Sequence, residues 1–187
     1  KIPLDDFSGK KGETLLLYRE KGIEKRVLLL GLGEKKSCLA ETLRQAYASA
    51  TKQLRAKKMK SCNILLPSFE NANAFSIIRA SLEGLILANY SFDLFKSTPI
   101  NEPLEKACIC GVDQSDLSLL KKVEQIAQGV YLARDLVNAN ADDSNVEGLI
   151  KAAKALEKDC KKLKVVVLRE KQLEKERMNL LLAVGKA

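Results

Sequence analysis

The stretch RVLLLGLGEKKSCLAETLRQAYASA, residues 26–50, decides the fold class. It opens with an apolar run of strand length that ends in the turn Gly31-Leu32-Gly33. After this turn, Ser37 is a candidate N-cap for a helix. Apolar residues then recur at helical spacing, at Leu39, Leu43, Ala46, Tyr47, Ala50 and Leu54. A strand, a glycine turn and an amphipathic helix in this order predict one unit of an α/β fold.

The same alternation of strand and helix patterns extends in both directions along the chain. Strands are predicted over 13–20, 25–33, 62–67, 106–112, 165–168 and 180–184. Helices are predicted from Ser68 onward, over 115–138, from Ser144 to Lys161 and over 170–177, with Ser144 and Glu147 as a capping box. The pattern predicts an α/β protein with a mixed sheet flanked by helices.

The composition indicates a globular protein of a reducing compartment, the cytoplasm. The 187 residues are 46% hydrophobic and 30% charged. The longest apolar runs, such as VLLLGLG at 27–33, are far shorter than the roughly 18 residues of a membrane span. Five cysteines, an odd number, show no disulfide-scaffold spacing. We expect no membrane partner and a cytoplasmic location.

The net charge of +8 raises the question of an anionic partner. The lysines are spread over several predicted helices instead of forming one basic arm, and only 5% of residues are aromatic. A base-stacking surface is therefore not expected, and nucleic-acid binding is the weaker interpretation. Histidine is absent, which excludes Ser-His-Asp and Cys-His catalysis.

The glycine turn at 31–33 has the context of a phosphate-binding loop, because it follows a strand and precedes a helix. The third glycine of a G-x-G-x-x-G motif would fall at position 36, which is Lys36. A tight strand-to-helix turn is therefore the preferred interpretation.

Two further groups of residues could bind metal ions. Cys108 and Cys110 lie two apart on a predicted strand and share a face, but no second cysteine pair or histidine completes a site, so we interpret them as buried small apolar residues. Four oxygen-bearing side chains crowd one loop between two helices: Asn138, Asn140, Asp142 and Asp143. Their spacing is not that of an EF-hand, and we interpret them as turn and cap residues.

Several segments, in order, resemble the cytosolic leucyl aminopeptidases. RVLLLGLGEKKSCLAETLRQAYASA resembles the amino-terminal Gly-Leu-Gly strand and helix of that family, and EGLILANYSFDLFKS (83–97) matches a later segment through Glu83, Gly84, Leu87, Tyr90, Phe92 and Lys96. ARDLVNANADDSNVEGLIKAAKAL (133–156) resembles the end of a connecting helix and the capped helix after it, and VVVLREKQLEKERMNLLLAVGKA (165–187) resembles the elements that follow. The loop after Asn138 reads Ala-Asn-Ala-Asp-Asp where the family carries prolines.

The resemblance implies a division of the chain. Residues 1–114 would be a macro-domain-like amino-terminal domain lacking its first strand, 115–138 a connecting helix, and 139–187 the first elements of a partial second α/β domain, the catalytic one. In the family the amino-terminal domain lies at the periphery of a homohexamer. The strand expected at 180–184 would lead toward the rest of the catalytic domain.

The resemblance also implies an activity for the full-length parent. Family members release amino-terminal residues, leucine and other neutral residues, from peptides with two divalent metals, manganese or zinc, which activate a water and polarise the scissile carbonyl. Their ligands lie in a Gly-Lys-Gly-x-Thr-Phe-Asp-x-Gly-Gly segment and an Asn-Thr-Asp-Ala-Glu-Gly-Arg segment, neither of which occurs in this sequence. Lys186 follows a strand that matches an earlier part of the family pattern, so we assign it no metal. We expect no catalytic, cofactor-binding or metal-ligating residue in this chain.

Two alternatives remain open at the level of sequence. The chain could be a free-standing macro-like module that binds a nucleotide or ADP-ribose-type ligand at the turn 31–33. It could also be a DNA-contacting domain, for which the net charge is the local support.

Overall fold

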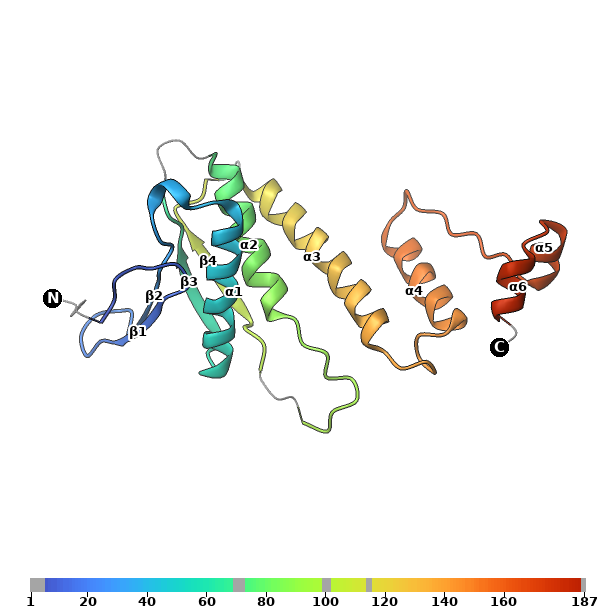
Figure 1. Ribbon diagram of the computed structural model, residues 1–187, viewed down its shortest axis with the longest axis horizontal. Coiled ribbons are helices and arrows are strands. Elements are labelled where there is room, and N and C mark those ends of the chain that lie inside the picture. The colour runs from blue at the N-terminus through green and yellow to red at the C-terminus, as the bar shows by residue number, and fades with distance from the viewer. Residues whose placement is uncertain (1–5, 69–72, 99–101, 114–115, 186–187) are drawn as a thin grey trace. The chain divides into compact units, whose positions relative to one another are not determined.

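The protein is described by a computed structural model, which covers residues 6–68, 73–98, 102–113 and 116–185 (Figure 1). The chain divides into two compact units, Lys1–Asp135 and Leu136–Ala187. None of the described helices combines the length and the apolar character that crossing a bilayer requires.

Four strands of the first unit form two small sheets. β1 (Thr14–Tyr18) pairs antiparallel with β2 (Arg26–Leu30), and β3 (Ser61–Leu65) pairs parallel with β4 (Lys106–Cys110). The α/β class expected from the sequence is confirmed. The strands nevertheless lie in two separate two-stranded sheets within the described part of the chain, where the sequence pattern had predicted one mixed sheet.

Three long helices accompany these sheets: α1 (Ala40–Ala56), α2 (Ala74–Asn89) and α3 (Leu117–Asn138). A short 3-10 turn, Lys35–Ser37, precedes α1. Figure 1 shows α1 and α2 running side by side across the strands, and these two helices share the largest interface between elements. On α3, Leu119, Val123 and Ala127 are buried, whereas Val137 near its end is 83% exposed.

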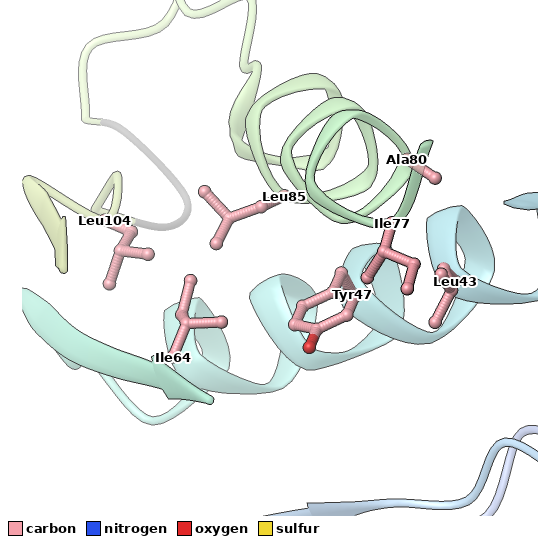
Figure 2. Close-up of a cluster of buried hydrophobic side chains, with 7 residues drawn as sticks. All are labelled: Leu43, Tyr47, Ile64, Ile77, Ala80, Leu85 and Leu104. Carbon is pink, nitrogen blue, oxygen red and sulfur yellow. The ribbon is translucent and has the colours of Figure 1, made fainter. Parts of the chain in front are cut away.

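The main core lies between α1, α2 and the sheet of β3 and β4. Side chains from all three converge in Figure 2, and the cluster consists of Leu43, Tyr47, Ile64, Ile77, Ala80, Leu85 and Leu104. The hydroxyl of Tyr47 donates to the carbonyl of Leu65 at 3.0 Å, which joins α1 to the end of β3. A second cluster of Ile78, Leu119 and Val123 holds α3 against α2. The helical periodicity therefore predicted the buried face of α1, with the exception of Leu39, which precedes the helix and is 69% exposed.

A glycine and an ion pair allow α1 and α2 to approach closely. A Cβ added at Gly84 would lie 2.2 Å from the carbonyl oxygen of Arg44, so only glycine fits where the two backbones meet. Beside this contact, Glu83 accepts hydrogen bonds from Arg44 Nε at 2.6 Å and from Arg79 Nε at 2.7 Å. Two residues singled out by the family resemblance thus define the helix contact.

The predicted starts of the first two helices are wrong, by two residues for α1 and by five for α2. α1 begins after Leu39, not after Ser37, because the 3-10 turn comes between them. α2 begins after Asn73, whose side chain accepts a hydrogen bond from the amide of Phe75. An asparagine oxygen caps that helix end, so Ser68 is not needed as its cap.

The second unit contains three helices: α4 (Val146–Asp159), α5 (Glu170–Lys175) and α6 (Asn179–Gly185). The predicted capping box of Ser144 and Glu147 is wrong. Asn145 caps α4 by accepting from the amide of Gly148 at 3.0 Å, while the hydroxyl of Ser144 donates to the carbonyl of Leu136 at 2.7 Å. Glu147 instead forms an ion pair with Arg169.

Neither strand predicted in the second unit is present. Residues 165–168 form an irregular connection, and the predicted strand over 180–184 lies within helix α6. A strand needs a neighbouring strand for its backbone hydrogen bonds, and the described residues of this unit offer none. A helix satisfies its backbone within the segment, and leucine and alanine are good helix formers.

Candidate functional site

Two segments far apart in the sequence meet at the carboxyl end of α2. The hydroxyl of Tyr90 donates to Asp135 Oδ1 at 2.8 Å, and the guanidinium of Arg134 lies 5.3 Å from the centre of the Tyr90 ring. Tyr131 packs against the same ring with centroids 5.1 Å apart. We call this group, together with Arg55, the α2–α3 junction.

The junction caps the last carbonyl groups of α2. Arg134 donates to the carbonyl of Leu87 at 2.9 Å, and Arg55 donates to the carbonyls of Ala88 and Tyr90 at 3.2 Å each. These carbonyls would otherwise lack intrahelical partners. Positive charge at the carboxyl end of a helix is also favoured by the helix dipole. Arg55 comes from α1, so the junction joins three helices.

One more donor completes the junction. The hydroxyl of Tyr131 donates to the carbonyl of Ile86. Burial raises the pKa of Tyr131, and the positive charges of Arg134 and Arg55 act against that rise. The phenol therefore stays protonated and remains a donor at neutral pH. The junction contains hydrogen-bond donors, a carboxylate and two tyrosine rings packed at a tilt of 55°, an arrangement that positions helices rather than one that carries out bond cleavage.

Arg55, like Tyr131, is a member of this group that the sequence did not single out. It is only 8% exposed although it is charged. Its position in the last turn of α1 favours an interaction with the dipole of its own helix. Only the packing of α2 against α1 shows that it serves the neighbouring helix.

The turn at 31–33 lies close against the backbone of residues 9–13. The amides of Gly31 and Gly33 donate to the carbonyls of Glu13 and Gly9 at 2.7 and 2.9 Å. A Cβ at Gly31 would lie 2.1 Å from the carbonyl oxygen of Lys10, and Gly33 has φ of +75°. Because its two glycine amides already have backbone partners, they are not available to a phosphate. The tight-turn interpretation is the one that the geometry supports.

The asparagine- and aspartate-rich loop is also held together by its own hydrogen bonds. Asn140 Oδ1 accepts from the amide of Asp143 at 2.9 Å, and the side chain of Asn145 donates to the carbonyl of Asp142 at 2.8 Å. Gly148 allows α4 to approach the loop, because a Cβ there would lie 2.0 Å from the carbonyl oxygen of Asp143. These contacts agree with the interpretation as a turn and helix cap.

The interpretation of Cys108 and Cys110 as buried residues is wrong. Both are exposed free thiols on β4. The two thiols do share a face of the sheet. The opposite face is the one that covers the core, because Ile64 of the paired strand β3 packs there. Strand alternation correctly placed them together, and which face is covered depends on the helices.

A hollow of about 280 Å³ lies beside the first turns of α1. It is lined by Lys11, Gly12, Thr42, Gln45, Ala46 and Ser49. The lining contains one cation and no carboxylate, so these residues do not form a site for a divalent metal.

None of the residues that the structure describes belongs to a group of three or more cysteine, aspartate or glutamate side chains that could hold a metal ion. Lys186, to which the sequence assigned no metal, lies outside the described residues.

Two parts of the chain match the two domains of one protein family. Residues 2–99 match the model of the cytosol aminopeptidase family, N-terminal domain, and residues 131–187 match the cytosol aminopeptidase family, catalytic domain. The chain belongs to the cytosol aminopeptidase family. The first match includes Tyr90 and the second includes Arg134 and Asp135, so the junction links the two family segments.

Relatives in this family align along almost the whole chain. A probable cytosol aminopeptidase of Protochlamydia amoebophila is 42% identical over 97% of this chain and 37% of its own length. One from Chlamydia trachomatis serovar A is 39% identical over 98% of this chain and 38% of its own length. The chain therefore spans a little over one third of the length of these cytosol aminopeptidases.

Two solved structures share the fold of this chain. A mutant of tomato leucine aminopeptidase superposes with a TM-score of 0.79 at 25% identity, over 91% of this chain and 34% of that chain. The bottromycin maturation enzyme BotP in complex with Mn superposes with a TM-score of 0.70 at 23% identity, over 83% of this chain and 32% of that chain. The second similarity is a similarity of fold alone.

Proposed function

We propose that this chain is the non-catalytic amino-terminal portion of a metal-dependent leucyl aminopeptidase. The observation that carries the proposal is the order of the two family matches: the N-terminal domain over 2–99, followed by a match to the catalytic domain over 131–187. The 42% identity to a probable cytosol aminopeptidase supports the same assignment.

The full-length parent would be a cytoplasmic homohexamer that releases leucine and other neutral residues from the amino termini of peptides, with two manganese or zinc ions. The described residues of this chain do not provide a ligand set for such ions. The two metal-binding segments of the family are also missing from its sequence. No step of hydrolysis is therefore assigned to residues of this chain.

In such an enzyme this chain would provide the folded N-terminal segment and would hold the connecting helix α3 against it. The α2–α3 junction supports this role, because Tyr90, Arg134 and Asp135 join the N-terminal segment to the helix that leads into the catalytic segment. These residues would act by positioning, since Arg134 donates to the end of α2 and the hydroxyl of Tyr90 donates to Asp135.

The proposal is tested by a peptidase assay on the purified chain with leucine p-nitroanilide and added Mn²⁺. We expect only the background rate, and we expect turnover from the full-length Protochlamydia relative measured in parallel. Metal-dependent turnover that stays with this chain through purification would contradict the proposal.

A further inference from the structure

The open face of the sheet formed by β3 and β4 carries two thiols. Cys108 and Cys110 stand two positions apart on β4, and both are exposed and free of disulfide bonds. Alternation along a strand places two such residues on the same face of the sheet. We call these two residues the β4 thiol pair.

The strand keeps the two thiols too far apart for a disulfide bond between them. β4 is paired with β3 over its whole length, so its backbone is held extended at both positions. Two positions along a strand span about 6.7 Å, whereas the Cβ atoms of a disulfide lie about 3.5–4.5 Å apart. Cys62 of β3 does not offer an alternative partner, because it packs against the core on the opposite face of the sheet.

The same spacing suits one metal ion held between the two sulfurs. Zinc–thiolate bonds are about 2.3 Å long, so two metal–sulfur bonds of similar length in a straight line place the sulfurs about 4.6 Å apart. From the spacing that the strand sets, the sulfurs need to approach each other by only about 2 Å, and the staggered rotamers of the two side chains permit this. The pair can therefore bind one ion without a change in the backbone.

The number of ligands restricts which ions can bind there. Across the described part of the chain, no three side chains of cysteine, aspartate or glutamate gather in a group that could hold a metal ion. A structural zinc site takes four ligands, so the β4 thiol pair does not complete one. Thiolates select soft ions. The soft ions that are satisfied by two sulfurs in a line are the monovalent cations with a filled d shell, copper(I) and silver(I).

Neighbouring side chains on the same face suit such an ion. Two thiolates and one monovalent cation form a complex with a single negative charge. Lys106 precedes Cys108 by two positions on β4 and thus places a positive charge on the same face. Leu65, opposite Cys110 on β3, is 80% exposed and adds an apolar side chain beside the second sulfur.

We infer that the β4 thiol pair is a binding site for one soft monovalent cation of the copper(I) type, held in linear coordination by the sulfurs of Cys108 and Cys110. On binding, each sulfur exchanges its proton for a bond to the ion, the two protons pass to solvent, and the ion keeps its oxidation state. β4 lies between the two segments that match the family, so the inference does not rest on the proposed function.

The test titrates copper(I), kept reduced by ascorbate, into the purified chain against the coloured competitor bicinchoninate. Silver(I) is titrated in parallel, and native mass spectrometry counts the ions and chains in each complex. The test variants are Cys108→Ser and Cys110→Ser. The matched control is Cys160→Ser, because Cys160 is also an exposed free thiol but has lysines, not cysteines, two positions away on either side.

We expect one tightly bound ion per chain in the unaltered protein and in the Cys160→Ser control. Each test variant should bind copper(I) on the order of a hundredfold more weakly, as loss of one of two linked ligands implies. Circular dichroism of the ion-free variants should be unchanged, because both side chains are exposed. Unchanged affinity in either test variant would overturn the inference, as would an ion shared between two chains.

Alkylation by iodoacetamide gives a second readout that needs no variant. One equivalent of silver(I) should slow the alkylation of Cys108 and Cys110 at least tenfold, on the order expected for a bound pair of thiols. Alkylation of Cys160 in the same sample should keep its rate. If Cys108 and Cys110 react as fast with the ion as without it, or if Cys160 is protected equally, the β4 thiol pair is not the site.

Discussion

Tyr90 and Asp135 are 45 positions apart in the chain, and the phenol hydroxyl of the first donates a 2.8 Å hydrogen bond to the carboxylate of the second. Arg134, next to Asp135, stacks over the same ring. Helix α3 is therefore held near its carboxyl end by this hydrogen bond and the cation–π contact. Near its beginning it is held by the apolar contacts of Leu119 and Val123.

This hydrogen bond can be measured by a double-mutant cycle. Tyr90→Phe, Asp135→Ala and the double variant are compared by urea denaturation, and we expect a coupling of about 1 kcal/mol because the acceptor is charged but exposed. Tyr18→Phe is the matched control, since Tyr18 is 69% exposed on β1, and it should change the free energy of unfolding by less than about 0.5 kcal/mol. Additive effects of the two junction variants would show that the bond contributes nothing.

The surroundings of two helical glycines predict opposite effects of a glycine-to-alanine substitution on the free energy of unfolding. Gly84→Ala places a Cβ 2.2 Å from the backbone of α1, and we expect a loss of about 2 kcal/mol in unfolding free energy. Gly129 lies in α3, and beyond its chain neighbours and the backbone of its own helix no atom lies within 4 Å of an added Cβ, so Gly129→Ala should stabilise the protein by about 1 kcal/mol. Thermal melts of both variants check this. A neutral Gly84→Ala would mean that α1 and α2 are not in close contact.

The ion pairs of Glu83 predict a dependence of stability on pH. Burial alone raises the pKa of Glu83, but the hydrogen bonds from Arg79 and Arg44 outweigh it and hold the pKa below its usual value. The stability this provides is present above the pKa of the unfolded chain and is lost as pH falls through the lower pKa of the folded state.

Glu83→Gln tests this dependence. We expect the variant to be about 2 kcal/mol less stable at pH 7, and the difference from the unaltered protein should shrink between about pH 5 and pH 3. Urea midpoints at pH 7, 5, 4 and 3 measure it. Other carboxylates with lowered pKa are shared by both proteins, so the difference isolates Glu83. A difference in stability between the two proteins that stays constant down to pH 3 would rule out a lowered pKa for Glu83.

The extended connection after α4 should exchange its amide protons quickly. Residues 166–168 are not paired with a strand in the described part of the chain, whereas 26–30 and 61–65 are paired. Hydrogen exchange followed by mass spectrometry should therefore show fast exchange in the first segment and slow exchange in the other two. Protection of 166–168 equal to that of β3 would indicate that another chain covers this segment.

Duplex DNA should bind this chain weakly despite the net charge of +8. Lysines such as Lys154 are paired with nearby carboxylates, and the others are spread over several helices and loops. A filter-binding titration should show a shallow dependence on salt. A tight complex at 150 mM salt that loses on the order of a thousandfold in affinity between 50 and 200 mM would establish a nucleic-acid role instead.

The local patterns of the sequence determined which segments of the first unit are strands and helices. Leu43, Ala46 and Tyr47 recur with the helical period and are buried, and the run before Gly31 is a strand, because apolar periodicity in the first unit reflects one covered face. The family segments could also be recognised from sequence, since Tyr90, Arg134 and Asp135 stand in them.

Tertiary structure alone decided what those residues do. Tyr90 meets Asp135, Arg55 caps a helix other than its own, and the face of β4 that carries Cys108 and Cys110 is open. The apolar runs at 165–168 and 180–184 have strand-like composition but form an irregular connection and part of a helix. The physical reason is the same in each case: strand pairing, helix capping across elements and burial of a sheet face depend on neighbours distant in sequence, and local periodicity carries no information about which neighbours are present.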